Sequence, residues 1–339
     1  MSLVRSRGAR ASALGCWVAL GCGAFGCLAL GCQSYRACDA VDEAALSQLP
    51  ERLSLTGLYA GEAVEIIAPD VRSFRPRFEL WSDGATKQRW IWLPPGAPID
   101  TSDMDAWQFP VDTKVWKEFI RDGVRVETRL LQRRAEGWIG VAYLWQEDES
   151  DAIAAPYGAI DALGTPHDVP ASNECDGCHA GRSSHVLGFS AVQLAQRPEQ
   201  ADPDALDLDE LIRSNRVTHA PAAAPVVPGS ETDQAALGYL HANCSHCHNG
   251  SRPERRGARC FDPEGDIDFS LRADETAAVS DTETYRTAMG EGIRRGRPDD
   301  SRIIELMSRR SRFSQMPPLA TETVDTEAVA LLRRWIEEL

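Results

Sequence analysis

Two copies of a Cys-x-x-Cys-His motif constrain this chain of 339 residues more than any other feature. The motifs comprise Cys175, Cys178 and His179, and Cys244, Cys247 and His248. Two thiols three residues apart, in a turn that leads into a helix, can add to the two vinyl groups of one haem. The adjacent histidine can then ligate the iron from the proximal side. The motifs therefore predict two covalent haem c groups, with His179 and His248 as proximal iron ligands.

Two other interpretations of the four cysteines stay open. All four could bind one zinc ion, although this leaves both histidines without a role and places thiolate ligands in an oxidising compartment. They could instead form redox-active or structural disulfides, because Cys-x-x-Cys is also a redox motif.

The first 31 residues have the pattern of an export signal. Residues 1–10 are basic, and residues 11–31 are uncharged and rich in Ala, Leu and Gly. The run ends in Ala29-Leu30-Gly31-Cys32, which resembles a bacterial lipobox and implies lipidation of Cys32. Ordinary cleavage and an uncleaved anchor are the alternatives. We expect a lipid-anchored protein on the periplasmic side of the cell envelope, where the compartment is oxidising.

The charge of the chain limits its partners. The formal net charge is −15, and it becomes −18 without residues 1–31, which hold three arginines and no acidic residue. Nonspecific binding to nucleic acid or to an anionic membrane requires a basic surface, so both are excluded as functions of the body. An acidic surface instead predicts redox partner proteins with a basic docking face.

Residues 53–155 predict a β-rich domain. Aromatic or alternating runs recur between turn signals, and Asp122-Gly123 between two of them predicts a hairpin. The predicted strands are Arg77–Trp81, Lys87–Leu93, Trp107–Phe109, Lys114–Ile120, Val124–Leu131 and Gly137–Trp145. The expected fold class is α+β and multidomain, with an antiparallel sandwich or barrel first and an all-α domain last. The seven tryptophans of this segment are interpreted as core residues, with a ligand-stacking platform as the alternative.

The remaining divisions follow composition and helical pattern. We expect a signal peptide over 1–31, a tether over 32–52, a first haem-binding segment and linker over 156–231, and a helical domain over 232–339. Predicted helices are one near Ser190–Gln196, one capped by Asp233, one starting at Asp300 or Ser301, and one capped by Asp325.

Residues 232–339 resemble a class I cytochrome c domain. A predicted helix precedes Cys244, and Gln315-Met316-Pro317-Pro318-Leu319 and a closing helix follow. This resemblance implies that Met316 is the sixth ligand of the second haem, where its thioether raises the reduction potential. Met289 and Met307 are the competing methionines, and Met307 is expected in the core.

The chain from about residue 53 to 339 also resembles a family of bacterial di-haem c-type cytochromes. The motifs that carry this resemblance are Phe78-Glu79-Leu80-Trp81-Ser82-Asp83-Gly84-Ala85, Lys87-Gln88-Arg89-Trp90-Ile91, Trp116-Lys117-Glu118-Phe119, Val126-Glu127-Thr128-Arg129, Glu174-Cys175-Asp176-Gly177-Cys178-His179 and Leu187-Gly188-Phe189. The resemblance implies two covalent haems and electron transfer, and no particular substrate.

The distal ligand of the first haem has no supporting motif. His185 is the first candidate, followed by His167, His219 and Met289, and an open iron is the alternative. His246, at a variable position of the second motif, is expected to be exposed. Cys38 and Cys260 are left over and could pair with each other.

Three functions remain at this stage. The main hypothesis is an exported carrier that passes single electrons, without catalytic residues of its own. The second is a di-haem oxidoreductase of peroxidase type with an open first haem. The third makes the β domain a ligand-binding module with the haems as a redox tail.

Overall fold

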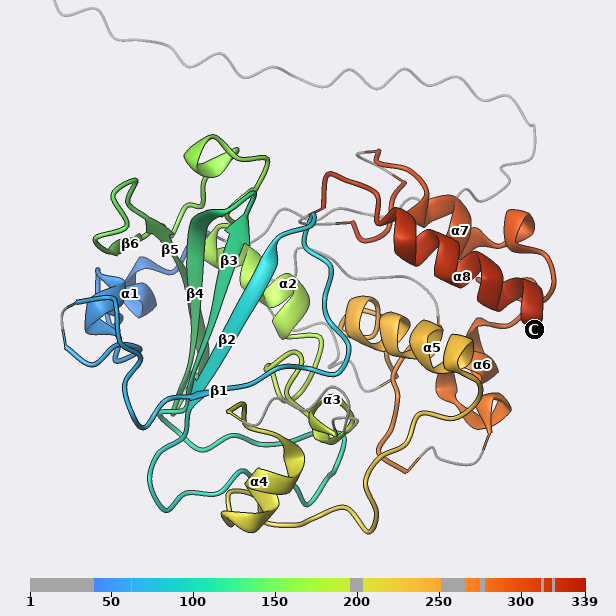
Figure 1. Cartoon of the computed structure of the whole chain (residues 1–339), viewed down its shortest axis with the longest axis horizontal. Helices are drawn as coiled ribbons and strands as arrows, with labels where there is room; N and C mark the ends of the chain where they lie inside the picture. Colours follow the sequence, from blue (N-terminus) through green and yellow to red (C-terminus); the bar gives the residue numbers. More distant parts are fainter. Residues whose placement is uncertain are drawn as a thin grey trace, which may run out of the picture. The chain divides into compact units, whose positions relative to one another are not determined.

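Six antiparallel strands that follow one another in the chain form a single sheet, in the order β1-β2-β3-β4-β5-β6 (Figure 1). The strands are β1 Arg72–Ser73, β2 Thr86–Trp92, β3 Lys114–Arg121, β4 Val124–Arg134, β5 Gly137–Trp145 and β6 Ala152–Ala154. The computed structural model describes residues 40–61, 63–195, 204–250, 266–274, 278–311, 314–318 and 321–339. The α+β class and four of the predicted strands are confirmed.

The hairpin between β3 and β4 forms where its turn residues predict it. Arg121 pairs with Val124, so the loop consists of Asp122 and Gly123 alone. Both loop residues have positive φ, 51° and 83°. A two-residue turn of this kind matches the twist of the flanking strands, and glycine adopts its second position without strain.

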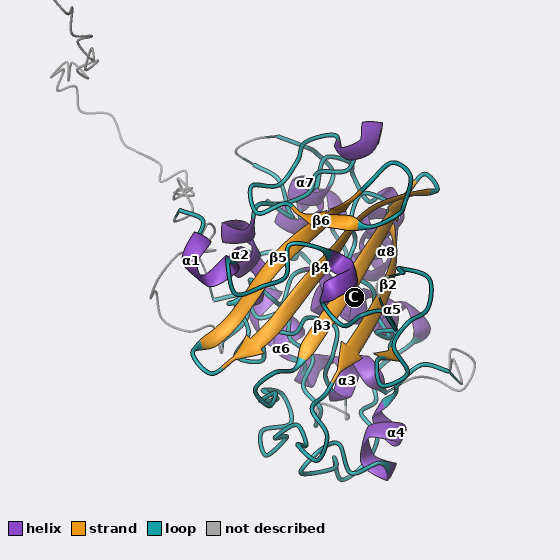
Figure 2. Ribbon diagram, turned by 90° about the vertical axis from the view of Figure 1, so that its left-hand side faces the viewer, coloured by secondary structure: helices purple, strands orange, loops and turns teal. Residues whose placement is uncertain are grey.

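The prediction of a sandwich or barrel is wrong. In the part of the chain that the structure describes, the six strands form one open sheet (Figure 2), and loops and short helices, with no second sheet, cover its two faces. Two predicted strands, Arg77–Trp81 and Trp107–Phe109, lie in loops. The amides of Arg77 and Phe78 donate instead to the backbone and side-chain oxygens of Gln193, at 2.7 and 3.0 Å, so this aromatic segment has no strand partner.

Tryptophans fill the core on both faces of the sheet. Trp116 and Trp145 are buried on one face, where their indole N–H groups donate to Thr56 and Thr128. Trp107 is buried on the other face, edge-on to Phe189. Of the seven tryptophans between residues 53 and 155, four are buried and Trp81, Trp92 and Trp138 are partly exposed, so the ligand-stacking platform stays a prediction.

Eight α-helices surround the sheet in the described residues. They are α1 Glu43–Leu46, α2 Cys175–His179, α3 Ala191–Leu194, α4 Leu208–Arg213, α5 Glu231–Asn243, α6 Glu283–Ala288, α7 Arg302–Met307 and α8 Thr326–Glu338. Asp325 caps α8 as predicted, accepting from the Ala328 amide at 3.0 Å. Ser230 caps α5 in place of Asp233, because the Ser230 hydroxyl and the Asp233 carboxylate bond each other's backbone amides reciprocally.

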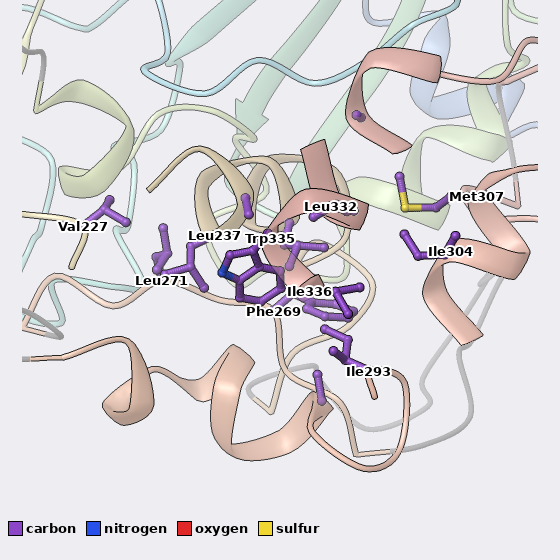
Figure 3. Close-up of a cluster of buried hydrophobic side chains, with 14 of the residues drawn as sticks. Val227, Leu237, Phe269, Leu271, Ile293, Ile304, Met307, Leu332, Trp335 and Ile336 are labelled. Carbon is purple, nitrogen blue, oxygen red and sulfur yellow. The ribbon is translucent and has the colours of Figure 1, made fainter. Parts of the chain in front are cut away.

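Helices α5 and α8 pack against each other through one apolar cluster (Figure 3). Leu237 and Leu240 of α5 meet Leu332, Trp335 and Ile336 of α8, and all five side chains are fully buried. The Trp335 indole also donates to Asp233 at 2.9 Å, which ties the two helices together with a polar bond.

The prediction of a self-contained, all-α class I cytochrome c domain over 232–339 is wrong. Among the described residues of this segment, only α5 and α8 exceed two turns. The segment before β2 also completes this part of the molecule. Phe78 packs into the α5–α8 cluster, and Asp83 accepts the backbone amides of Glu322 and Thr323 at 2.9 and 3.0 Å.

Several sequence predictions lie outside the described residues. These are the signal peptide over 1–31, lipidation of Cys32, the part of the tether over 32–39, and the pairing of Cys38 with Cys260. In the described part of the chain, no helix is both long and apolar enough to span a membrane. The domain boundaries at 155 and 231 stay predictions.

The contact between α5 and Phe78 predicts that Gly238→Ala destabilises the protein. In an exposed helix this change stabilises by about 1 kcal/mol. Here the added Cβ would overlap the Phe78 ring, so we expect a net loss of about 1–2 kcal/mol from overpacking. Urea unfolding of the wild type and the variant measures the change.

Combining Gly238→Ala with Phe78→Leu provides the control. We expect the smaller leucine side chain to remove most of the penalty, because it leaves room for the added Cβ. An equal penalty in both backgrounds would contradict this account of the contact.

Candidate functional site

The first motif forms its own short helix, α2, directly after a 3-10 turn at Ser172–Glu174. Nδ1 of His179 donates to the backbone oxygen of His185 at 2.6 Å. A carbonyl can only accept, so this bond fixes the proton on Nδ1 and leaves Nε2 as the nitrogen with a free lone pair. Burial lowers the pKa of His179 to about 4, which keeps it neutral and able to ligate a metal at neutral pH.

The first motif lies against the sheet. A Cβ on Gly140 of β5 would lie 3.4 Å from the Cys175 sulfur, so this thiol packs directly over the sheet at Gly140. Burial raises the pKa of Cys175 to about 12. The Arg129 side chain of β4 counters this rise through its charge. The first motif therefore lies beside β4 and β5, and charged side chains of β4 change the pKa of its thiols.

The second motif follows α5 without a break. The helix ends at Asn243, Cys244 is its C-cap, and His248 N–H donates back to the Cys244 oxygen at 2.8 Å. Asn243 is held by the first half of the chain, since its side chain accepts from the Trp81 amide and donates to the Glu79 oxygen. The turn that carries the second motif is thus fixed from both sides.

One apolar cavity collects the residues predicted to bind the second haem. Its volume is about 60 Å³, and it is partly open to solvent. Cys244, Cys247, His248 and Met316 all line it. Its apolar wall includes Phe269, Ile303 and Met307. A mostly apolar cavity with a few convergent donor atoms is the usual form of a cofactor site.

Hydrogen bonds hold Met316 in this cavity. Its backbone amide donates to the Leu306 oxygen of α7 at 3.1 Å. The Gln315 side chain donates to the oxygens of Pro317 and Thr321, at 3.1 and 3.2 Å, which braces the loop after it. The competing Met307 lines the same cavity but is 4% exposed and belongs to the core, as predicted. Met289 packs against the same helical cluster.

The two motifs are in direct contact with each other, which the sequence did not predict. A Cβ on Gly181 would overlap the backbone oxygen of His246, so the chain after the first motif touches the second. Two side chains bridge this contact. Asn249 donates to the Gly181 oxygen at 3.0 Å, and Arg182 donates to the Ser245 hydroxyl at 2.5 Å.

The attachment cysteines themselves come together at this contact. The Cys247 thiol and the His246 imidazole lie within hydrogen-bonding reach of the Cys178 sulfur, and they hold the pKa of Cys178 well below its usual value. Cys247 also lies 3.8 Å from the Gly177 oxygen. The expectation that His246 is exposed is wrong, because its ring is buried between the motifs.

The other predicted distal ligands of the first haem all have protein contacts. His185 stacks on Trp138 with 6.3 Å between the ring centroids. His167 is buried and lies 2.7 Å from the Glu127 carboxylate. His219 bonds Thr218. These contacts do not identify one of the three histidines as the distal ligand opposite His179. Their role as ligands stays a prediction.

Sequence reasoning missed the residues that join the motifs. Arg182, His246 and Asn249 each stand within four residues of a motif histidine, but no local pattern signals that two motifs 69 residues apart touch. The four cysteines are free thiols here, and they form no disulfide with one another. Among the described residues, no three His, Cys, Asp or Glu side chains are grouped to hold one metal ion, so the zinc alternative has no site.

No match was found for this chain among models of protein families. The curated proteins gave no match. None of the solved structures matches it. The resemblance to a family of di-haem c-type cytochromes is therefore overturned, because the expected class I domain is absent and no ready-made metal-binding group occurs in the described residues. What remains is the chemistry of the two motifs.

The contact at Gly181 predicts a stability cost for any side chain there. Gly181→Ala would push its Cβ into the backbone of the second motif, and backbone cannot move aside as a flexible side chain can. We expect a loss of about 1–3 kcal/mol of unfolding free energy, measured by urea unfolding.

Gly292→Ala is the matched control, since its nearest neighbour is the end of the Ile267 side chain at 3.1 Å. We expect a smaller loss there. If both variants lose the same stability, the two motifs do not press on each other at Gly181.

Proposed function

We propose that this chain is an exported c-type cytochrome that carries two covalent haem groups and transfers single electrons in the bacterial envelope. The observation that carries the proposal is the cavity in which Cys244, Cys247, His248 and Met316 converge. These four residues supply two thiols for attachment, an imidazole and a thioether, and Met316 is 68 positions from His248 in the chain.

The chain's own residues have distinct roles in this proposal. The four motif cysteines would attach the groups, and His179 and His248 would ligate the iron atoms. Bound haem supplies an iron centre that alternates between ferric and ferrous states. Met316 favours the ferrous state because its sulfur is soft and uncharged, and the apolar wall around it excludes water.

Contact between the motifs supports a role in electron transfer. Cys178 and Cys247 are neighbours, and Arg182 and Asn249 hold the two turns together. An electron that enters at one motif would thus leave at the other without diffusion of a partner. The net charge of the chain, −15, supports docking to basic redox partners, at rates that fall as salt rises.

A peroxidase-type oxidoreductase is the second candidate. It is favoured by the contacts of the predicted distal residues at the first motif, since His167 bonds Glu127 and His185 stacks on Trp138. An iron with no sixth protein ligand could react with peroxide.

The main proposal also includes export through residues 1–31 and a lipid anchor at Cys32.

Haem content provides the first test. We expect two covalent haems per chain in protein made with haem-attachment machinery, one in Cys175→Ser/Cys178→Ser and one in Cys244→Ser/Cys247→Ser. The pyridine haemochrome spectrum and the intact mass measure them. Absence of covalent haem in the wild type would overturn the proposal. Peroxide turnover at the loaded first motif would favour the oxidoreductase.

Met316 provides the second test. We expect Met316→Leu to abolish the weak far-red band that a methionine–iron bond gives in oxidised haem, and to lower the reduction potential of one haem only. Met307→Leu is the control, because Met307 lines the same cavity from the helix core. Loss of the band in Met307→Leu instead would assign the ligand to Met307.

A further inference from the structure

Three cations form a row across the sheet, on the face that meets the first motif. Arg89 of β2 is the register partner of Lys117 of β3, and Lys117 is the partner of Arg129 of β4. Register partners on one face have Cβ atoms about 4.5–5.5 Å apart, and like charges placed opposite each other are destabilising. Lys87, two residues before Arg89, projects from the same face.

The carboxylates near this row do not balance it. Arg89 lies 3.7 Å from Glu79, and Arg129 makes two bonds to Glu127, at 2.9 and 2.5 Å. Glu127 is shared with His167. Among the described residues, neither Lys87 nor Lys117 makes an ion pair.

The surroundings make this arrangement costly. The Arg89 side chain is 5% exposed, and Arg129 and Lys117 both lie over the Phe119 ring. Burial and the neighbouring cations lower the pKa of Lys117 well below its usual value and that of Lys87 to about 8. In a chain with a net charge of −15, a row of cations that repel one another indicates a site kept for an anion.

The row lies beside the attachment point of the first motif. The charge of Arg129 acts on both Cys175 and Cys178, and that of Lys117 acts on His179. Gly140, which contacts the Cys175 sulfur, pairs with Leu131, and Leu131 stands two residues from Arg129 on the same face. Arg129 and Lys117 are therefore the two cations of the row that lie nearest to the first motif.

We propose that Arg89, Lys117 and Arg129, with Lys87, form a carboxylate-binding site that takes the propionate groups of the haem attached at Cys175 and Cys178. This inference rests on the proposed attachment of haem at the first motif. Planar guanidinium groups bind carboxylates through paired hydrogen bonds, and lysine adds a point charge. A free dicarboxylate has the same chemistry and is the other source of such an anion.

A stability cycle on the full chain tests the site. Lys117→Met is made in the wild type and in Cys175→Ser/Cys178→Ser, which keeps the second haem and leaves the first motif unloaded. We expect the substitution to raise the melting temperature of the unloaded chain by about 2 °C or more, because it removes an amine that is costly to bury and lies among other cations. In the loaded chain, we expect it to lower the melting temperature, because a partner of the propionates is lost.

Lys114→Met is the matched control, on the same strand but the opposite face, where Lys114 donates to the Thr56 oxygen. Lys114→Met should change the melting temperature of the loaded and the unloaded chain by the same amount. An equal effect of Lys117→Met in both chains would overturn the site. Haem counts on the same samples separate this result from failure of the proposed function, which would appear as an unloaded first motif in the wild type.

Succinate distinguishes the two sources of carboxylate, with sodium chloride at equal ionic strength as its control. We expect succinate to stabilise only the unloaded chain, and only while Lys117 is present. Equal stabilisation of the loaded chain would show that the row stays open and would overturn the propionate assignment in favour of a free anion. If succinate stabilises neither chain, and if Lys117→Met has the same effect in the loaded and the unloaded chain, there is no anion site.

Discussion

The close approach of Gly181 to the backbone of His246 is the contact on which the site depends. It brings two motifs 69 residues apart in sequence to one place, and it needs a residue without a side chain. The side chains of Arg182 and Asn249 then form hydrogen bonds across the same contact, one from each turn. Because of this contact, the two motifs lie next to each other in the folded chain.

The rest of the fold holds this contact in place from two directions. On one side, α2 packs over the sheet, with the Cys175 sulfur next to Gly140. On the other, the α5–α8 pair presents the second motif at the end of α5. The segment from Phe78 to Asp83 links these parts, because it bonds α3, α5 and the loop before α8. The same segment explains why the C-terminal helices are not an independent domain.

The row of Arg89, Lys117 and Arg129 on the sheet lowers the stability of the protein, because buried like charges lie next to one another. A face that packs against helices would be expected to hold apolar side chains, as Ile91 and Val115 do in the neighbouring row. Arg89, Lys117 and Arg129 break this rule together. Departures from local consistency are expected where a protein binds something, because binding can supply the energy that the empty site lacks.

Local chemistry was enough to predict much of this protein. The Asp122-Gly123 hairpin, the alternating strands around it, the Asp325 cap and the apolar face of α8 depend on neighbours within one or two turns, so the sequence alone determined them. The two motifs were visible for the same reason. The aromatic run at Arg77–Trp81 misled the strand prediction, because its hydrogen-bond partner, Gln193, lies more than a hundred residues away. Only the tertiary structure decided that the motifs touch, that Met316 shares a cavity with His248, and that three cations align, because each depends on contacts between distant segments that no local pattern encodes.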